Sequence, residues 1–488
     1  MIDQLVNECA NFHLECEAPQ VVALPSRILD VQSSADANAI FPLVSGGRNG
    51  KYAALSYCWG GQQDVVAKED TWEELMKGIP LSVLPKTIQD AVVVTRRLGL
   101  QYLWVDALCI KQDSKEDWGL ESSKMADIYG NAAVTIAAAG GSDCNTGCFL
   151  RHLDNRKPDT FLIDLPNGEE GCISIRVQND YTSSEDPLHT RAWGLQERLL
   201  SPRLLTFSTG IVTWQCQAKV GMRGIGSVRL PSLFFQRPSV VRRWNWQAGV
   251  SDSATLHKVW AQISLDFSRR SITYETDILP ALSGLARRFQ EVTGDMYLAG
   301  LWKETLRRSL LWQSSHDGKG VRPATYVAPT WSWLSLRGPI LHRSSTQNDK
   351  LPIHIEIVDA ETTLASLDPT GPVLGGKITL RGRVREARLK GRDLWGIGAE
   401  AGCAGFVILD TSPESVGALG GSTWCLWILK SEGLLLKSSG ANFQRVGIFV
   451  LDKTPNDHGK AGKKDSCDDE KAAEEWFKDG EVWTMTLV

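Results

Sequence analysis

The stretch that decides the fold runs Tyr102-Leu103-Trp104-Val105-Asp106-Ala107-Leu108-Cys109-Ile110-Lys111-Gln112-Asp113. It is an apolar run between Gly99 and three polar residues, which predicts a buried strand over 102–108 that leads into a helix. Asp106 needs a partner there, because burying an unpaired carboxylate is costly. Open α/β sheets build their binding sites at the carboxyl ends of such strands. Asp106 and Gln112 are therefore candidate ligand-binding residues.

Strand and helix patterns alternate around this run. Strands are expected over 52–58, 102–108 and 132–139, and helices over 85–98 and 117–129. In the helix 85–98, apolar residues recur at three- and four-residue spacing, with Pro85 at its start and Gly99 just after its end. This rhythm predicts an α/β fold whose mainly parallel sheet is covered by helices on both faces.

The chain changes character twice further on. A hairpin is expected at 204–214, helical periodicity covers 254–313, and strands recur from 353 onwards. We therefore expect four segments: an N-terminal lead-in 1–50, the α/β domain 51–220, a helical extension 221–340 and an antiparallel β-rich domain 341–488. Within the last segment, the charged residues 452–475 are expected to form a solvated loop.

The composition is that of a globular protein, and it argues against several functions. Of the 488 residues, 42% are hydrophobic and 23% are charged, and the net charge of −4 gives no general attraction to nucleic acid or anionic lipid. No apolar run approaches the ~20 residues that span a bilayer, and the N-terminus shows no signal-peptide pattern. We therefore expect no membrane span and a cytoplasmic location. The 11 cysteines, mostly in apolar contexts, are expected to be reduced.

Three blocks of the sequence combine aromatic and polar residues at high density, and we call them the signature blocks: 52–60, 102–113 and 190–200. In this order they resemble the fungal heterokaryon-incompatibility (HET) domain family, and the resemblance continues over residues 25–333. It implies a role in non-self recognition and programmed cell death when incompatible fungal cells fuse. The domain has also been likened to the TIR domain, some of whose members cleave NAD. The resemblance thus implies a TIR-like, flavodoxin-like α/β fold, with NAD as a candidate substrate.

Glu121 is the first candidate catalytic residue. The spacing Ser114, Trp118, Glu121 resembles the segment in which TIR domains hold their catalytic glutamate. If Asp117 caps the helix, Glu121 lies one turn further on, near the end of the helix dipole that stabilises anions. The alternative is structural, because Glu121 can complete a capping box or pair with Lys124 at i,i+3.

The third signature block supplies the second candidate catalytic residue, Glu197. Arg191, Trp193, Gln196 and Glu197 offer a cation, a ring face, an amide and a carboxylate. Such a set can bind the ribose or phosphate of a nucleotide through charge-assisted hydrogen bonds and stacking. The alternative is a buried ion pair that holds the helix onto the sheet.

The first signature block supplies the remaining ligand-binding candidates, which are Ser56, Trp59 and Gly60. They follow a strand in a loop whose backbone amides can approach an anion. The alternatives are an ordinary glycine turn and an Asp106 that merely accepts hydrogen bonds from this loop.

No metal site and no bound cofactor are expected. Cys144, Cys148 and His152 have a metal-like spacing but no close fourth ligand.

Two functions follow from these residues. In the first, Glu121 or Glu197 stabilises the oxocarbenium-like ribosyl cation formed when NAD or a related nucleotide is cleaved. In the second, the domain is a non-enzymatic module for recognition or self-association with protein partners, and the acids are structural. A solvent-open pocket lined by Glu121, Trp59 and Arg191 would favour the first. In both cases, we expect the signature blocks to meet in space, because polar groups in apolar segments need partners.

Overall fold

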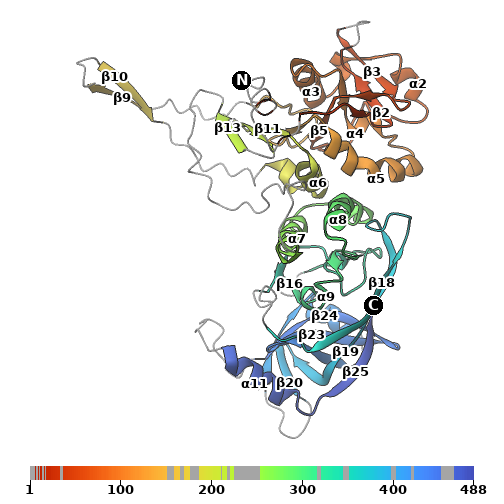
Figure 1. Cartoon of the computed structure of the whole chain (residues 1–488), viewed down its shortest axis with the longest axis vertical. Coiled ribbons are helices and arrows are strands. Elements are labelled where there is room, and N and C mark those ends of the chain that lie inside the picture. Colours follow the sequence, from red (N-terminus) through yellow and green to blue (C-terminus); the bar gives the residue numbers. More distant parts are fainter. Residues whose placement is uncertain are drawn as a thin grey trace. The chain divides into compact units, whose positions relative to one another are not determined.

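The chain divides into two compact units, Met1–Asn245 and Trp246–Val488 (Figure 1). The computed structural model describes residues 6, 9, 11, 13, 16, 18–32, 37–150, 159–164, 170–175, 186–209, 211–216, 220–224, 253–315, 320–343, 351–396, 403–418, 422–451 and 466–488. Each unit has its own sheet, and each is described by itself.

The first unit is built on a mixed sheet. Its strands are β2 (Arg27–Asp30), β3 (Ala39–Val44), β5 (Tyr52–Tyr57), β6 (Ile79–Pro80), β7 (Tyr102–Trp104), β8 (Val134–Ala138), β11 (Leu204–Ser208), β12 (Ile211–Gln215) and β13 (Val220–Gly224). Within the described residues, the nine strands lie in the order β13-β12-β11-β8-β5-β7-β2-β3-β6. The four strands β11, β8, β5 and β7 are parallel, and the outer strands pair antiparallel. The predicted parallel arrangement of three strands is confirmed as the centre of a mixed sheet.

Three helices connect the parallel strands. The connections run through α3 (Lys86–Arg97) from β5 to β7, α5 (Lys115–Asn131) from β7 to β8, and α6 (Ala192–Leu200) from β8 to β11. Figure 1 shows α3 on one face of the sheet and α5 and α6 on the other. This is the arrangement that right-handed crossovers produce for this strand order. Every residue of β5 is buried, as expected of a strand covered on both faces.

The signature block around Asp106 departs from the predicted strand 102–108. Strand β7 ends at Trp104, and Asp106–Cys109 form the short helix α4. The Cys109 amide bonds the Val105 carbonyl at 2.8 Å, and the Asp106 carboxylate accepts the Ala107 N–H at 2.7 Å. The prediction was wrong in extent because a buried helical turn is as apolar as a buried strand.

The helix predicted over 117–129 begins earlier, at Lys115. Its N-cap is Ser114, whose hydroxyl accepts a hydrogen bond from the Asp117 amide at 3.3 Å. Asp117 is therefore not the cap. Its carboxylate pairs instead with Arg27 on β2, so the start of α5 is fastened to the sheet.

Smaller elements complete the first unit. They are β1 (Val22–Ala23), β4 (Asn49–Gly50), α2 (Trp72–Leu75), η1 (Leu81–Val83), the hairpin β9 (Asp159–Asp164) and β10 (Glu170–Ile175), and η3 (Pro187–Thr190). The predicted hairpin at 204–214 is β11 and β12, and it extends the parallel sheet through β11.

The second unit begins with helices and small strands. These are α7 (Ser253–Ser268), η5 (Glu275–Asp277), α8 (Pro280–Thr293), β14 (Tyr297–Leu298), β15 (Leu301–Trp302), α9 (Leu306–Ser309), β16 (Trp312–Ser314), η6 (Trp333–Ser335) and β17 (Ile340–His342). Tryptophan rings fill much of this part, and Trp260, Trp302, Trp312, Trp331 and Trp333 are all buried. Trp260 and Trp302 meet edge to face with ring centroids 5.1 Å apart.

The predicted antiparallel C-terminal sheet is confirmed in the same unit. Its strands are β18 (Ile355–Leu364), β19 (Val373–Lys390), β20 (Asp393–Gly396), β21 (Cys403–Leu409), β22 (Thr423–Leu429), β23 (Glu432–Ser439), β24 (Asn442–Leu451) and β25 (Glu481–Leu487), and α10 (Pro413–Ala418) follows β21. The long β19 pairs with both β20 and β22, so the pairings form a closed ring. Part of the predicted loop 452–475 is instead the helix α11 (Ser466–Trp476), while 452–465 lie outside the described residues.

Candidate functional site

The candidate site lies at the carboxyl edge of β5. From β5 the chain moves to its neighbour β7 and then returns past β5 to β8, so the order of strands reverses between β5 and β8. In open α/β sheets, ligands bind outside the carboxyl ends of the strands at such a reversal. Figure 1 shows α6 beneath these strands, and α6 carries the third signature block.

The first and third signature blocks meet at this edge. The Ser56 hydroxyl, at the end of β5, donates a hydrogen bond to the Glu197 carboxylate on α6. Both side chains are buried, with 3% and 4% exposed. The Arg191 guanidinium, at the N-terminus of α6, donates to the carbonyl oxygen of Tyr57. Helix α6 is therefore held to β5 by polar contacts at two points.

The second signature block joins the same cluster through Asp106. Its carboxylate accepts a hydrogen bond from the Trp59 indole N–H at 2.9 Å. The charge of Asp106 also acts on Arg191, together with that of Glu197. The three signature blocks therefore meet, as predicted, around one guanidinium. We call Ser56, Trp59, Asp106, Arg191 and Glu197 the β5-edge cluster.

Burial sets the electrostatics of the β5-edge cluster. Burial lowers the pKa of Arg191, but Glu197 and Asp106 outweigh it, and the net pKa is raised. Burial raises the pKa of Asp106, and Arg191 offsets only part of this. The pKa of Tyr57 is raised well above its ordinary value by burial and then by Asp106, so its phenol stays neutral. With both acids ionised, two carboxylates face one guanidinium.

Aromatic rings border the cluster and are partly exposed. Trp193, on α6, meets Trp118, on α5, edge to face, with ring centroids 6.3 Å apart. Trp59, Trp118 and Trp193 are each partly buried, as are Asp106 and Arg191. The cluster thus has a buried side at Ser56 and Glu197 and a more accessible side at the rings.

Residues 52–197 match the family model described as heterokaryon incompatibility protein (HET). We call this matched segment the HET domain. The match begins at the first residue of β5 and ends at Glu197, so it includes every residue of the β5-edge cluster. No curated protein and no solved structure matches the chain. In the part of the chain that the structure describes, no helix has the length and hydropathy of a membrane span.

Gly60 and Gln112 have structural contacts within the HET domain, and Gln196 is buried there. Gly60 has a φ of 73°, and a Cβ on it would lie 2.1 Å from the Cβ of Asp143, so only glycine fits this crossing of two loops. The Gln112 amide donates to the carbonyls of Asp106 at 3.1 Å and Ile110 at 2.8 Å, which closes the turn after α4. Gln196 is 1% exposed on α6.

Glu121 is placed in different contacts from those of the β5-edge cluster. It is 2% exposed and pairs with Lys124 at 2.8 Å, the i,i+3 contact that was the structural alternative. Lys124 also donates to the Ser26 hydroxyl at 2.9 Å, next to β2. The structure therefore groups Glu197, and not Glu121, with Ser56 and Arg191.

Asp186 is a further acid near this edge that the sequence analysis missed. It is 1% exposed, and its carboxylate accepts one hydrogen bond from Ser208 at 2.7 Å. The other carboxylate oxygen is buried and has no hydrogen-bond partner among the described residues. Its charge acts on Cys58, just after β5, as do those of Arg191 and Glu197. An acid before a proline at the start of a helix resembles an ordinary cap in sequence, which is why it gave no signal.

We expect Asp186→Asn to stabilise the first unit in a pH-dependent way. Burial raises the pKa of Asp186 to about 6. Because the pKa of Asp186 is higher in the folded than in the unfolded chain, the wild-type unit keeps its full stability below about pH 4. As the pH rises through 6, the free energy of unfolding falls by up to about 3 kcal/mol. The variant should unfold at a higher temperature than the wild type above pH 6 and at the same temperature near pH 4. Asp64→Asn, at an exposed position, is the control, and an equal gain at both pH values would contradict the assignment.

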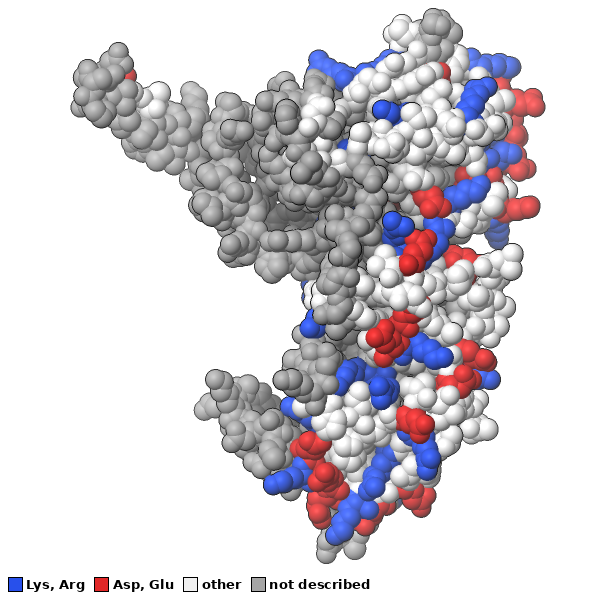
Figure 2. Space-filling model, in the orientation of Figure 1, with Lys and Arg blue, Asp and Glu red and all other residues white. Residues whose placement is uncertain are grey.

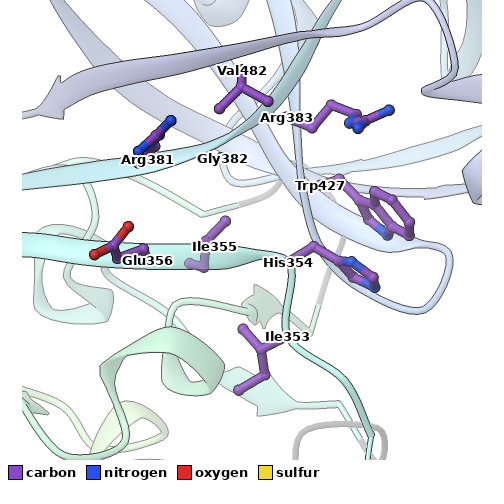
Figure 3. A pocket seen from close by; sticks show the side chains of 9 residues that line it. All are labelled: Ile353, His354, Ile355, Glu356, Arg381, Gly382, Arg383, Trp427 and Val482. Atoms are coloured by element: carbon purple, nitrogen blue, oxygen red, sulfur yellow. The ribbon is translucent and has the colours of Figure 1, made fainter.

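The second unit has a separate hollow of about 370 Å³ (Figure 3). His354 stacks on Trp427 there, with ring centroids 3.6 Å apart. Burial lowers the pKa of His354, although Glu470 opposes this. The hollow is open and lies outside the HET domain. On the face of the molecule seen in Figure 2, positive and negative side chains are interspersed over the described surface.

Proposed function

We propose that this protein acts in heterokaryon incompatibility as a programmed-cell-death effector inside the cell, and that its HET domain binds and cleaves NAD or a related nucleotide at the β5-edge cluster. The observation that carries the proposal is the convergence of Ser56, Arg191 and Glu197 at the carboxyl end of β5. The strand order reverses at that point, and α/β sheets of this kind bind nucleotides at such a reversal.

The order of the parallel strands supports a TIR-like and flavodoxin-like assignment. In chain order, β5, β7, β8 and β11 are the first to fourth parallel strands, and their spatial order is 2-1-3-4. The flavodoxin-like sheet begins with the same order and binds its cofactor where the order reverses, between its first and third strands. In this chain that point lies between β5 and β8.

The charge of the cluster suits cleavage of the bond to nicotinamide. Breaking the bond between the ribose C1′ and the nicotinamide nitrogen leaves the electron pair on nicotinamide, whose positive charge is neutralised. A carboxylate stabilises the ribosyl cation that forms, and water then adds to C1′ and gives up a proton. Glu197 is the candidate catalytic carboxylate. Asp106 adds a second negative charge, and Arg191 positions Glu197.

The remaining residues of the site have proposed binding roles. The partly exposed rings of Trp59 and Trp193 offer stacking surfaces for the nicotinamide or adenine ring. Ser56 fixes the orientation of the Glu197 carboxylate through its hydrogen bond. Gly60 and Gln112 hold the loops around these groups, and Gln196 is buried on α6 beside Glu197 in the sequence.

Mass spectrometry of NAD and other nucleotides incubated with the purified protein at high concentration tests this function. We expect the wild type to release nicotinamide and Glu197→Gln to lose this activity and its toxicity on overexpression, since the amide keeps the size of the side chain but removes its charge. Glu121→Gln is the matched control, because Glu121 is equally buried but pairs with Lys124. The enzymatic proposal fails if the wild type leaves every nucleotide intact, or if a stable Glu197→Gln variant remains fully toxic.

A non-enzymatic alternative has one observation in its favour. Glu121 and Glu197 are each less than 5% exposed, and each has a polar partner, Lys124 or Ser56, which is also how structural acids behave. In that case the HET domain works through protein partners or self-association. Toxicity should then follow thermal stability, and Trp59→Ala and Trp193→Ala should be as damaging as Glu197→Gln.

A further inference from the structure

Three cysteines and one histidine converge at a second place in the first unit. The sulfur atoms of Cys9, Cys16 and Cys216 and a ring nitrogen of His13 all lie within 4.8 Å of one another. The Nδ1 atom of His13 is 3.3 Å from the Cys216 sulfur and 3.8 Å from the Cys16 sulfur. The three cysteines are buried, with at most 7% exposed. We call these four residues the Cys3His cluster.

The cluster joins parts of the chain that are far apart in sequence. Three members come from the N-terminal residues, in the spacing Cys9-x3-His13-x2-Cys16, and the backbone at Cys9 is helical. The fourth, Cys216, directly follows β12. The three cysteines belong to the same hydrophobic core as the parallel strands β5 and β8.

The donor set is that of a structural zinc site. Zinc takes four ligands in a tetrahedron, and three cysteines with one histidine are among its usual closed sets. With Zn–S bonds of about 2.3 Å and Zn–N bonds of about 2.0 Å, the edges of that tetrahedron are about 3.5–3.8 Å long. The N–S edge is about 3.5 Å, and the two sulfur distances from His13, 3.3 and 3.8 Å, lie on either side of it. Thiolate ligands exclude magnesium and calcium, which prefer oxygen.

A nearby cation suits the charge of such a site. Zinc with three thiolates and a neutral imidazole carries a net charge of −1, which needs compensation in a buried place. Arg203 is only 6% exposed, and its positive charge acts on Cys9. A buried guanidinium therefore faces the cluster.

We propose that Cys9, His13, Cys16 and Cys216 bind one zinc ion, which fastens the N-terminal residues to the end of β12. Strand β12 pairs with β11, which follows α6 and lies beside β8. The zinc ion thereby braces the side of the sheet that carries α6 and Glu197. Its role is structural, because the four protein ligands leave no open position for a substrate. The proposal does not depend on whether the HET domain cleaves a nucleotide.

Metal analysis of the full-length protein, purified under reducing conditions, tests this inference. We expect one zinc per chain in the wild type and loss of that zinc in Cys216→Ser and Cys9→Ser. Cys148→Ser is the matched control, since Cys148 is also buried in the first unit but bonds the Thr87 carbonyl. A strong chelator should lower the unfolding temperature of the wild type by several degrees, and added zinc should restore it.

A second variant keeps the test decisive if a cysteine variant fails to fold. His13→Cys should retain one zinc, because four cysteines are also a structural zinc set, whereas His13→Ala should bind it more weakly. Cobalt in place of zinc should give the visible bands of a tetrahedral thiolate site. Wild-type protein without zinc, a disulfide between any two of the three cysteines, or full zinc content in Cys216→Ser would each overturn the proposal.

Discussion

Replacing Arg445 with methionine is expected to lower the free energy of unfolding of the second unit by about 3–5 kcal/mol, the cost of leaving a buried charge without its partner. Arg445 is 0% exposed and pairs with Asp410 at 3.0 Å. It also donates to the carbonyls of Leu310 at 3.2 Å and Trp312 at 2.6 Å. Its guanidinium carbon lies 3.3 Å from the centroid of the Trp312 ring.

These contacts explain why the loss should be large. Burial lowers the pKa of Arg445 to about 10 and raises that of Asp410 against the pull of Arg445 and Arg322. Among the described residues, the charge of Asp410 is compensated by Arg445 at 3.0 Å and by Arg322 at 3.8 Å. Without Arg445, Asp410 keeps the desolvation cost and loses most of the compensation. The carbonyls of Leu310, just after α9, and Trp312, in β16, also lose this donor.

Hydrogen exchange measured peptide by peptide reports the stability of the second unit separately. Global denaturation of a chain with two units would not separate the two contributions. Peptides of β24 and β16 should exchange much faster in Arg445→Met. Arg288→Met is the control, because Arg288 and its partner Glu291 are 42% and 50% exposed and such pairs contribute about 0–1 kcal/mol. Adding Asp410→Asn to Arg445→Met should recover part of the loss. Protection unchanged in Arg445→Met would show that the ion pair contributes nothing.

The architecture of the HET domain was largely predictable because its signals are local. Apolar runs separated by amphipathic helices predict parallel strands, and β5, β7 and β8 follow that pattern. The end of β7 was not predictable, because Val105 and the apolar residues 107–109 stay buried when the chain turns into α4. Hydrophobicity in a sequence indicates burial but not backbone conformation. The conformation at Asp106 depends on which backbone N–H donates a hydrogen bond to its carboxylate.

The contacts within the site were predictable in part. Polar residues inside apolar blocks had to find partners, and Ser56, Asp106 and Glu197 did so in one place. The role of Glu121 stayed open in the sequence, because an i,i+3 lysine and a catalytic position have the same spacing. Only the structure shows the pair with Lys124.

Contacts between distant segments left weaker signals. The spacing Cys9-x3-His13-x2-Cys16 was visible, but its fourth ligand, Cys216, lies 200 positions further on and had to be placed by the fold. The pair of Arg445 and Asp410 gave no signal, because each residue stands alone at a strand or strand end. Sequence periodicity reports the face of an element, and it does not report which distant charge will lie against it.

Replacing Arg191 with methionine should produce the second large effect, and its size should depend on pH. At neutral pH the variant leaves Glu197 and Asp106 without the guanidinium that faces them, which should cost the first unit about 3–5 kcal/mol. The folded-state pKa of Asp106, which burial already raises, then rises further, because Arg191 no longer offsets part of that effect. The stability of the variant is therefore fullest below about pH 4 and is lost as the pH rises.

Unfolding followed by circular dichroism at pH 4 and pH 7.5 would measure this dependence. The lower pH is close to the pKa of the acids in the unfolded chain, and the higher pH is well above it. The gap between Arg191→Met and the wild type should be wide at the higher pH and narrow at the lower one. Arg97→Met, at an exposed position on α3, is the matched control. Adding Glu197→Gln to Arg191→Met should recover stability at the higher pH, since it removes the unpaired charge. An equal loss of stability at both pH values, with no recovery in the double variant, would contradict this prediction. Arg191 would then stabilise the first unit through packing and its hydrogen bond to the Tyr57 carbonyl, and not by compensating the charges of Glu197 and Asp106.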